Sequence, residues 1–181
     1  MRKLSIPLLL ATALTGAVLS ACSPKFDWRD YRSNDAPYAV LFPGKPATQT
    51  RNIDLAGTEV SMTMAAAEVD GITFAVGSAL LADAAKAQAA LPAMKTALLK
   101  NIGASVTADK VAAQSSGNGG AAAQQTTLDV EAKGTRNGES MLLIGRFVAK
   151  DKRIYQVIIM GREKHIVRET VDTFLSSFKL N

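Results

Sequence analysis

Two side chains that commonly act as a nucleophile or a general base occur once each in this chain of 181 residues, Cys22 and His165. A cysteine beside a histidine can form a thiolate nucleophile, and a histidine can activate a serine hydroxyl. The sequence contains no Gly-x-Ser-x-Gly motif, and no pattern places a nucleophile next to His165. A zinc site needs several His or Cys ligands, more than this sequence offers. We therefore predict no catalytic residue, no metal site and no cofactor, and we interpret His165 as a surface or capping residue.

Carboxylates and thioethers are the other candidate groups. The Asp and Glu residues are spread along the chain without the spacing of a calcium loop. Two of them could still meet in the fold and act as a glycosidase pair, so a hydrolase with an unrecognised carboxylate site stays open as an alternative. Met62, Met64 and Met160 could bind copper through soft sulfur ligands. However, Met62 and Met64 alternate with polar residues, which favours ordinary core packing.

The first 21 residues have the three parts of a secretory signal. Arg2 and Lys3 form a basic start, an apolar stretch follows over 4–18, and small residues stand at Ser20 and Ala21. A membrane-spanning helix would need roughly 20 consecutive apolar residues, and this stretch is shorter and broken by Pro and Gly. We therefore expect the segment to be removed.

The residues Leu19-Ser20-Ala21-Cys22 at the end of this segment resemble a lipobox, the signature of bacterial lipoproteins. The resemblance implies cleavage between Ala21 and Cys22 and a diacylglyceryl thioether on the Cys22 sulfur, which would anchor the chain stably in a membrane. The alternative is an ordinary cleavage site followed by a chance cysteine. Ser23 follows Cys22, and in this family Ser at that position indicates the outer membrane, facing the periplasm, more than the inner membrane.

The mature chain is predicted to be one domain behind a short linker. We assign 1–21 to the signal peptide, 22–37 to the acylated N-terminus and linker, and 38–181 to a single globular domain, a size sufficient for a hydrophobic core. Without Arg2 and Lys3 the basic side chains number 19 against 16 acidic ones, and no block of like charge occurs. This mild excess does not indicate a nucleic-acid partner.

Three aromatic residues interrupt the linker, Phe26, Trp28 and Tyr31. They could lie at the lipid interface, where Trp and Tyr are favoured. We expect them instead to dock on the domain, because an exposed Phe-x-Trp pair is costly to leave in water. They are also possible partner contacts.

The hydrophobic periodicity predicts an α+β domain, a mostly antiparallel sheet packed with an Ala-rich helix and a C-terminal helix. Asp70-Gly71 and Asn137-Gly138 are typical of tight hairpin turns. Pro92 favours a kinked or two-piece Ala-rich helix. We expect strands over 38–42, 48–55, 58–69, 72–76, 105–114, 123–132, 139–149 and 153–160, a loop over 115–120, and helices over 83–102 and 167–178.

Three further segments resemble the layout of PsbP-like domains: Phe42-Pro43-Gly44-Lys45-Pro46, Arg153-Ile154-Tyr155 and Phe174-Leu175-Ser176-Ser177-Phe178-Lys179-Leu180. This family includes an extrinsic photosystem II subunit, a Ran-binding nuclear import factor and many bacterial envelope proteins of unknown role. The resemblance covers residues 38–180. It implies an α/β/α sandwich and a binding or assembly function without catalytic residues.

Taken together, these features predict a membrane-anchored cell-envelope lipoprotein whose domain binds an envelope protein, of unknown identity, and catalyses no reaction. An envelope carrier of a small apolar ligand is the first alternative, and a cavity between the sheet and the Ala-rich helix would be its mark. The hydrolase is the second alternative.

Overall fold

The computed structural model describes residues 25–55, 57–101, 103, 105–116 and 123–181. In this part of the chain two helices, α1 and α2, and a short 3-10 helix, η1, accompany ten strands in two antiparallel sheets. The elements in chain order are β1 (Arg29–Arg32), β2 (Tyr38–Phe42), β3 (Ala47–Leu55), β4 (Thr58–Val69), β5 (Ile72–Leu80), α1 (Ala84–Asn101), β6 (Ser105–Ser116), β7 (Ala123–Arg136), β8 (Glu139–Lys150), β9 (Arg153–Arg162), η1 (Glu163–His165), α2 (Arg168–Ser177) and β10 (Lys179–Leu180).

A seven-stranded sheet in the order β3-β4-β5-β9-β8-β7-β6 forms the body of the domain. Every neighbouring pair in it is antiparallel. Central β9 is buried along almost its whole length, as expected for a strand that is covered on both faces. The predicted α+β class is confirmed.

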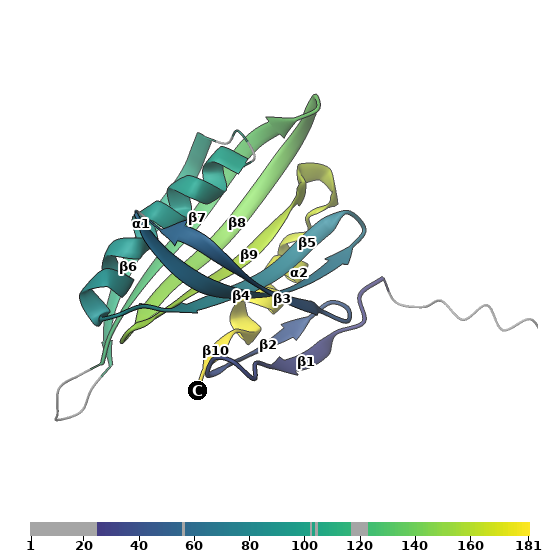
Figure 1. The fold of residues 1–181 in the computed structure, drawn as a ribbon. Coiled ribbons are helices and arrows are strands. Elements are labelled where there is room, and N and C mark those ends of the chain that lie inside the picture. Colours follow the sequence, from purple (N-terminus) through teal and green to yellow (C-terminus); the bar gives the residue numbers. More distant parts are fainter. Residues whose placement is uncertain (1–24, 56, 102, 104, 117–122) are drawn as a thin grey trace, which may run out of the picture.

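The two faces of the large sheet are covered by different layers (Figure 1). Helix α1 packs on one face, where its buried Leu91 and Met94 contact aliphatic side chains of the sheet. On the other face lie α2 and a three-stranded sheet in the order β1-β2-β10. The core of this second face is aromatic: Phe174 contacts Phe42 and Phe74, with ring centroids 5.5 and 5.3 Å apart.

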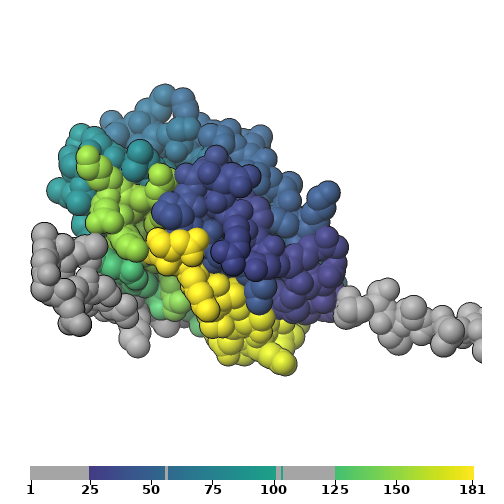
Figure 2. Space-filling model, turned by 90° about the horizontal axis from the view of Figure 1, so that it is seen from below, coloured from purple at the N-terminus to yellow at the C-terminus, as the bar shows by residue number. Residues whose placement is uncertain are grey.

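The small sheet joins the two ends of the described chain. Strand β2 pairs with β1 on one side and with β10 on the other. Figure 2 shows the residues at the start of the described chain, in purple, lying against the C-terminal residues, in yellow, on one face of the molecule. The Leu41 backbone N–H also donates to the Ser177 hydroxyl at 3.0 Å, which ties the end of α2 to β2.

Local signals account for the turns and for the start of α1. Asp70, Gly71, Asn137 and Gly138 all have positive φ, as a type I′ hairpin turn requires. Asp83 caps α1 by accepting a hydrogen bond from the Lys86 backbone N–H at 2.8 Å. The turn predictions at 70–71 and 137–138 are therefore confirmed.

Several predicted boundaries differ from the structure. β1 lies inside the predicted linker, so the ordered domain begins earlier than residue 38. The predicted loop over 115–120 starts too early, because β6 continues through Ser116, and its remaining residues lie outside the described residues. β10 was not predicted, because a strand of two residues has no periodicity of its own and exists only through its pairing with β2.

Two further differences concern the helices. α1 runs unbroken through Pro92, so it is not two pieces. Pro92 is exposed, whereas neighbouring Leu91 is buried, so tertiary packing of the inner face holds the helix together across the missing hydrogen bond. Val167 precedes α2 as its N-cap residue and is 53% exposed, so the helix begins one residue later than the predicted range 167–178.

The predicted alternation of β4, with one buried face, is correct for only half of the strand. Val60 and Met62 are buried toward α1, but Ala65 and Ala67 are buried on the opposite face. The two covering layers therefore overlap different halves of β4. A prediction that one face of a strand is buried along its whole length cannot show that the buried face changes within the strand.

Candidate functional site

The predicted cleavage and lipidation residues, Ala21 and Cys22, lie outside the described residues. The described chain begins at Lys25, three residues after Cys22. Lys25 forms an ion pair with Asp70 in the β4–β5 turn, with Nζ and Oδ2 2.5 Å apart. Its ammonium group also lies 5.5 Å from the centre of the Phe26 ring. The chain is thus in contact with the folded domain directly after the predicted anchor position.

The aromatic residues Phe26, Trp28 and Tyr31 dock on the domain, as we expected. Phe26 lies between Trp28 and Phe74, with ring centroids 6.0 and 6.4 Å away. Tyr31 meets Phe42 edge-on at 5.5 Å. All three rings are half-buried, so much of their apolar surface is used in packing. Their role as partner contacts stays a prediction.

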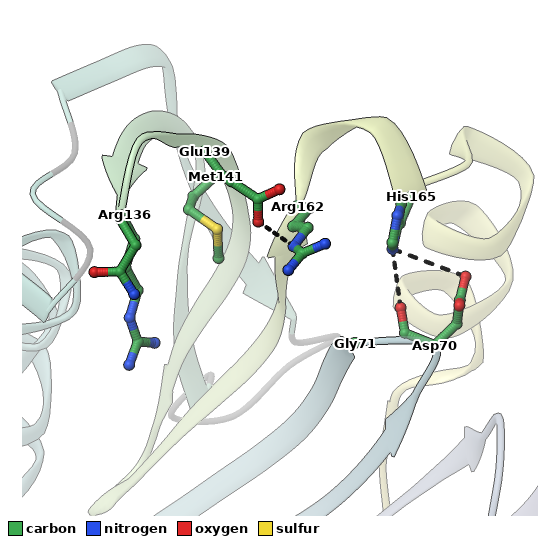
Figure 3. Close-up of a pocket in the computed structure, with 8 residues that line it drawn as sticks. Asp70, Gly71, Arg136, Glu139, Met141, Arg162 and His165 are labelled. Carbon is green, nitrogen blue, oxygen red and sulfur yellow. Dashed lines mark hydrogen bonds and ion pairs between the residues drawn. The ribbon is translucent and has the colours of Figure 1, made fainter.

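One open hollow of about 740 Å³ lies at the end of the large sheet where the described chain begins. Its lining comes from the β4–β5 turn, the β7–β8 turn and the end of β9 with η1: Asp70, Gly71, Arg136, Asn137, Glu139, Met141, Arg162 and His165. Figure 3 shows Asp70 and His165 on one side and Arg136, Met141 and Arg162 on the other. We call this region the Asp70 end.

Ion pairs organise most of the charge at the Asp70 end. The His165 Nδ1 lies 3.1 Å from the backbone oxygen of Asp70 and 3.9 Å from its Oδ2. Arg162 pairs through Nε with Glu139, and the Lys164 ammonium lies 3.7 Å from the other oxygen of that carboxylate. Glu163, the first residue of η1, accepts hydrogen bonds from Lys133 of β7 and Ser140 of β8.

The electrostatics of these carboxylates do not suit acid catalysis. The hydrogen bond from Lys25 lowers the pKa of Asp70, and hydrogen bonds from Lys133 and Ser140 lower the pKa of Glu163. A glycosidase acid needs a raised pKa, so these shifts have the opposite sign. Among the described residues, no Ser or Thr hydroxyl is hydrogen-bonded to His165. The part of the chain that the structure describes also holds no cluster of His, Cys, Asp or Glu fit for a metal ion.

Arg136 differs from the other charged residues of the Asp70 end. Within the described ranges its guanidinium has no hydrogen-bond or ion-pair partner. It is the last residue of β7 and pairs in register with Glu139 across the turn. Its side chain lines the hollow together with Arg162 (Figure 3). Two guanidinium groups, one of them unpaired, therefore face one open space.

A second hollow, of about 380 Å³, lies at the opposite end of the large sheet. Leu80, the last residue of β5, is 59% exposed there, and the buried Tyr155 also lines it. The rest of the lining is Pro37, Asn181, the acidic Asp151 and three basic residues, Lys150, Lys152 and Arg153. We call this region the Leu80 end.

The basic groups of the Leu80 end are free. Lys150, Lys152 and Arg153 have no ion-pair partner among the residues that the structure describes. Burial raises the pKa of Tyr155, so its phenol stays protonated at neutral pH. This surface thus combines an exposed aliphatic side chain with unpaired positive charge.

The sulfur atoms of Met62 and Met64 face the same buried amide. The Gln156 side-chain N–H group donates to both, at 3.6 and 3.2 Å. Gly77 makes room for this group, because a Cβ there would lie 2.5 Å from the Met64 sulfur. The thioethers thus satisfy a polar group within the α1-facing core, which is a structural role.

No model of a known protein family matches this chain, and no curated protein sequence matches it. Among solved structures, the chain is similar to a protein of unknown function from Pseudomonas aeruginosa that has been suggested to be a regulator. The two share 12% identity with a TM-score of 0.31, over 76% of this chain and 84% of the other. In the described part of this chain, no helix combines the length and apolar character that crossing a membrane requires.

Sequence reasoning missed both hollows. Leu80 lies beyond the strand that we predicted over 72–76, because β5 continues to Leu80. The basic residues near it lie where the predicted strands 139–149 and 153–160 meet. Arg136 and Arg162 are 26 positions apart in the chain, and only the pairing of β7, β8 and β9 brings them to one surface. The local signal that could have pointed to the Leu80 end is the pair of lysines around Asp151.

Proposed function

We propose that this chain is a lipid-anchored protein of the bacterial cell envelope whose domain binds a partner protein and catalyses no reaction. The lipobox-like residues Leu19 to Cys22 support the anchor, and the Lys25–Asp70 ion pair supports a short connection between anchor and domain. The PsbP-like resemblance supports a binding domain. The outer membrane, on its periplasmic side, is the location we propose.

The observation that carries the binding function is the exposed Leu80 in its basic hollow. Leu80 lines a hollow, where an exposed aliphatic side chain gives a partner an apolar contact beside positive charge. Lys150, Lys152 and Arg153 surround it with positive charge, and none of the three has an ion-pair partner in the described part of the chain. The partner that fits is an envelope protein segment with an apolar side chain for the Leu80 contact and acidic side chains around it.

The two alternative functions receive less support. A carrier of an apolar ligand would need space between α1 and the sheet, but buried side chains such as Leu91, Met94 and Phe147 fill that interface. A hydrolase would need a carboxyl group with a raised pKa, whereas Asp70 and Glu163 have lowered ones. Neither alternative has a described hollow with the chemistry that it requires.

The anchor is tested by replacing the lipidated residue. Cys22→Ser should abolish incorporation of a radioactive fatty acid and release the protein from the membrane fraction. A Ser5→Ala variant, which changes a residue of the signal away from the lipobox, serves as the control and should behave like the natural chain. Unchanged fatty-acid labelling of the Cys22→Ser variant would show that the anchor is wrong.

The binding surface is tested with two matched variants. Leu80→Asp should reduce in-cell crosslinking from a photoreactive residue at Ala82 to its partner by about tenfold or more, as expected for loss of a central contact. Val167→Asp alters the other exposed large hydrophobic residue, which is 53% exposed, and should leave the crosslink unchanged. Equal effects of the two variants would contradict a contact at Leu80.

A further inference from the structure

The chain reaches the Asp70 end of the domain almost directly from the predicted anchor. Three peptide units separate Cys22 from Lys25, so their Cα atoms lie at most about 11 Å apart. Lys25 is held at Asp70, and Phe26 is packed on the aromatic core directly after it. An acyl chain on Cys22 would therefore place the lipid headgroups close to Asp70.

Three other segments lie at this same end of the sheet. The β4–β5 turn, the β7–β8 turn and the β9–η1 junction all line one hollow. In Figure 1 these turns and the start of the described chain are on one side of the molecule, while the β8–β9 turn lies on the other. Leu80 is the last residue of β5 and Ala82 follows two positions later, so both lie at that opposite end of a nine-residue strand about 30 Å long.

The charges of the Asp70 end suit an anionic surface. Five basic side chains lie at this end with three carboxylates, those of Asp70, Glu139 and Glu163; the basic residues are Lys25, Lys133, Arg136, Arg162 and Lys164. Arg162 contacts Glu139 through Nε, and a guanidinium carries further N–H donors beyond that one. Arg136 has all of its donors free within the described part of the chain. Two guanidinium groups beside one hollow of about 740 Å³ suit a phosphate, whose oxygens accept several such hydrogen bonds.

We propose that the Asp70 end faces the bilayer and that its hollow binds the phosphate of an anionic lipid headgroup between Arg136 and Arg162. This inference rests on the proposed lipid anchor at Cys22. It adds an orientation, with the Leu80 end directed away from the membrane toward the partner. Positive charge alone does not show which end faces the membrane, because the Leu80 end is basic too. The short connection to Cys22 is the reason for choosing the Asp70 end.

The orientation is tested with the full acylated chain in vesicles. Thr135→Cys and Ala82→Cys each introduce a thiol at an exposed, uncharged residue, one at each end. Acylation blocks the sulfur of Cys22, so a fluorophore labels only the new thiol. With a quencher on the lipid headgroups, the Thr135 fluorophore should be quenched strongly and the Ala82 fluorophore weakly. Equal quenching, or the reverse order, would overturn the orientation.

The phosphate site is tested by changing the lipid. Phosphatidylglycerol added to phosphatidylcholine vesicles should increase the quenching of the Thr135 fluorophore. Arg136→Gln should lower the membrane-facing population in these vesicles about fivefold, the effect of one basic side chain near an anionic surface. Lys152→Gln removes the same charge at the Leu80 end and should have no such effect. Equal effects of the two variants would overturn the assignment of Arg136.

Two further results distinguish failure of this inference from failure of the proposed lipid anchor on which it rests. Mass analysis that shows no acyl group on Cys22 would overturn the proposed anchor and the inference together. The acylated chain could bind inorganic phosphate through Arg136 while quenching of the Thr135 fluorophore does not respond to phosphatidylglycerol. This result would show a site for a free anion and overturn the lipid assignment alone.

Discussion

The two ends of the large sheet use similar residues in different ways. At the Asp70 end most charges are paired with each other, as in Lys25–Asp70 and Arg162–Glu139. At the Leu80 end the basic side chains of Lys150 and Lys152 have no ion-pair partner among the described residues, and they surround an exposed Leu80. Paired charges hold the chain in place, whereas free charges beside apolar surface are available to another molecule. On our proposals, the Asp70 end near the anchor faces the membrane and the Leu80 end faces the partner protein.

Both ends depend on the core between them, and the largest expected effect comes from breaking it. Phe174 is fully buried and contacts Phe42 and Phe74. Phe174→Ala should lower the free energy of unfolding by about 3–5 kcal/mol, because it leaves a cavity in the aromatic layer. Urea denaturation measures this change. Ser176→Ala, at an exposed position of the same helix, should stay within about 0.5 kcal/mol, and a similar loss there would contradict the packing argument.

Charge reversal at the Leu80 end should weaken the partner interaction. Lys152→Glu is expected to slow association several-fold and to reduce its dependence on salt, because rim charges act mainly on the association rate. Once the crosslinked partner has been identified, surface plasmon resonance at two salt concentrations measures this. Lys45→Glu, an exposed lysine in the β2–β3 connection, is the matched control. If both reversals slow association equally, the effect is one of net charge and the Leu80 end is not the contact.

Loss of the Lys25–Asp70 pair should loosen the first described residues without unfolding the domain. Trp28, the single tryptophan, packs beside Phe26 and reports on this segment by its fluorescence. Asp70→Asn should shift Trp28 emission to longer wavelength, while circular dichroism stays the same. Asp30→Asn, an exposed carboxylate in β1, is the control. Unchanged emission would mean that aromatic packing alone holds the segment.

The smallest expected effect is a change with pH at the Asp70 end. The folded-state pKa of Asp70 is lowered from its ordinary value of 3.8, chiefly by the hydrogen bond from Lys25. The stabilisation is therefore complete above pH 3.8 and is lost as the pH falls through the lowered folded-state pKa. In a pH titration, Trp28 emission should shift only below that pH in the natural chain. The Asp70→Asn variant should lack this transition, and a transition retained in the variant would assign it to another group.

Local sequence signals were sufficient for some parts of the fold. Asp70-Gly71 and Asn137-Gly138 predicted their turns because few residue types tolerate positive φ. The apolar run over 153–160 predicted a strand, and β9 is buried on both faces there. The helical spacing of apolar residues over 83–102 predicted α1. The helix continues through Pro92 because Leu91 and Met94 beside it are packed in the core.

Other parts of the fold could not be predicted from short stretches of the sequence. β1 and β10 exist only because each pairs with β2, and β10 is far from β2 in the chain. The burial of β4 changes sides because α1 covers one half and the small sheet the other. Neither hollow was predicted, because each is formed by turns that are distant in sequence.

The amino-acid sequence alone was enough to predict the turns at 70–71 and 137–138 and the α+β class, since these follow from backbone preferences and from the spacing of apolar side chains. It also predicts the lipid anchor at Cys22, a property of four consecutive residues. The folded structure was needed to show that Lys25 pairs with Asp70, which other charges are paired, and that Leu80 is exposed. Such properties depend on distances between side chains that are far apart in the sequence. Strand pairing and the packing of the layers set these distances.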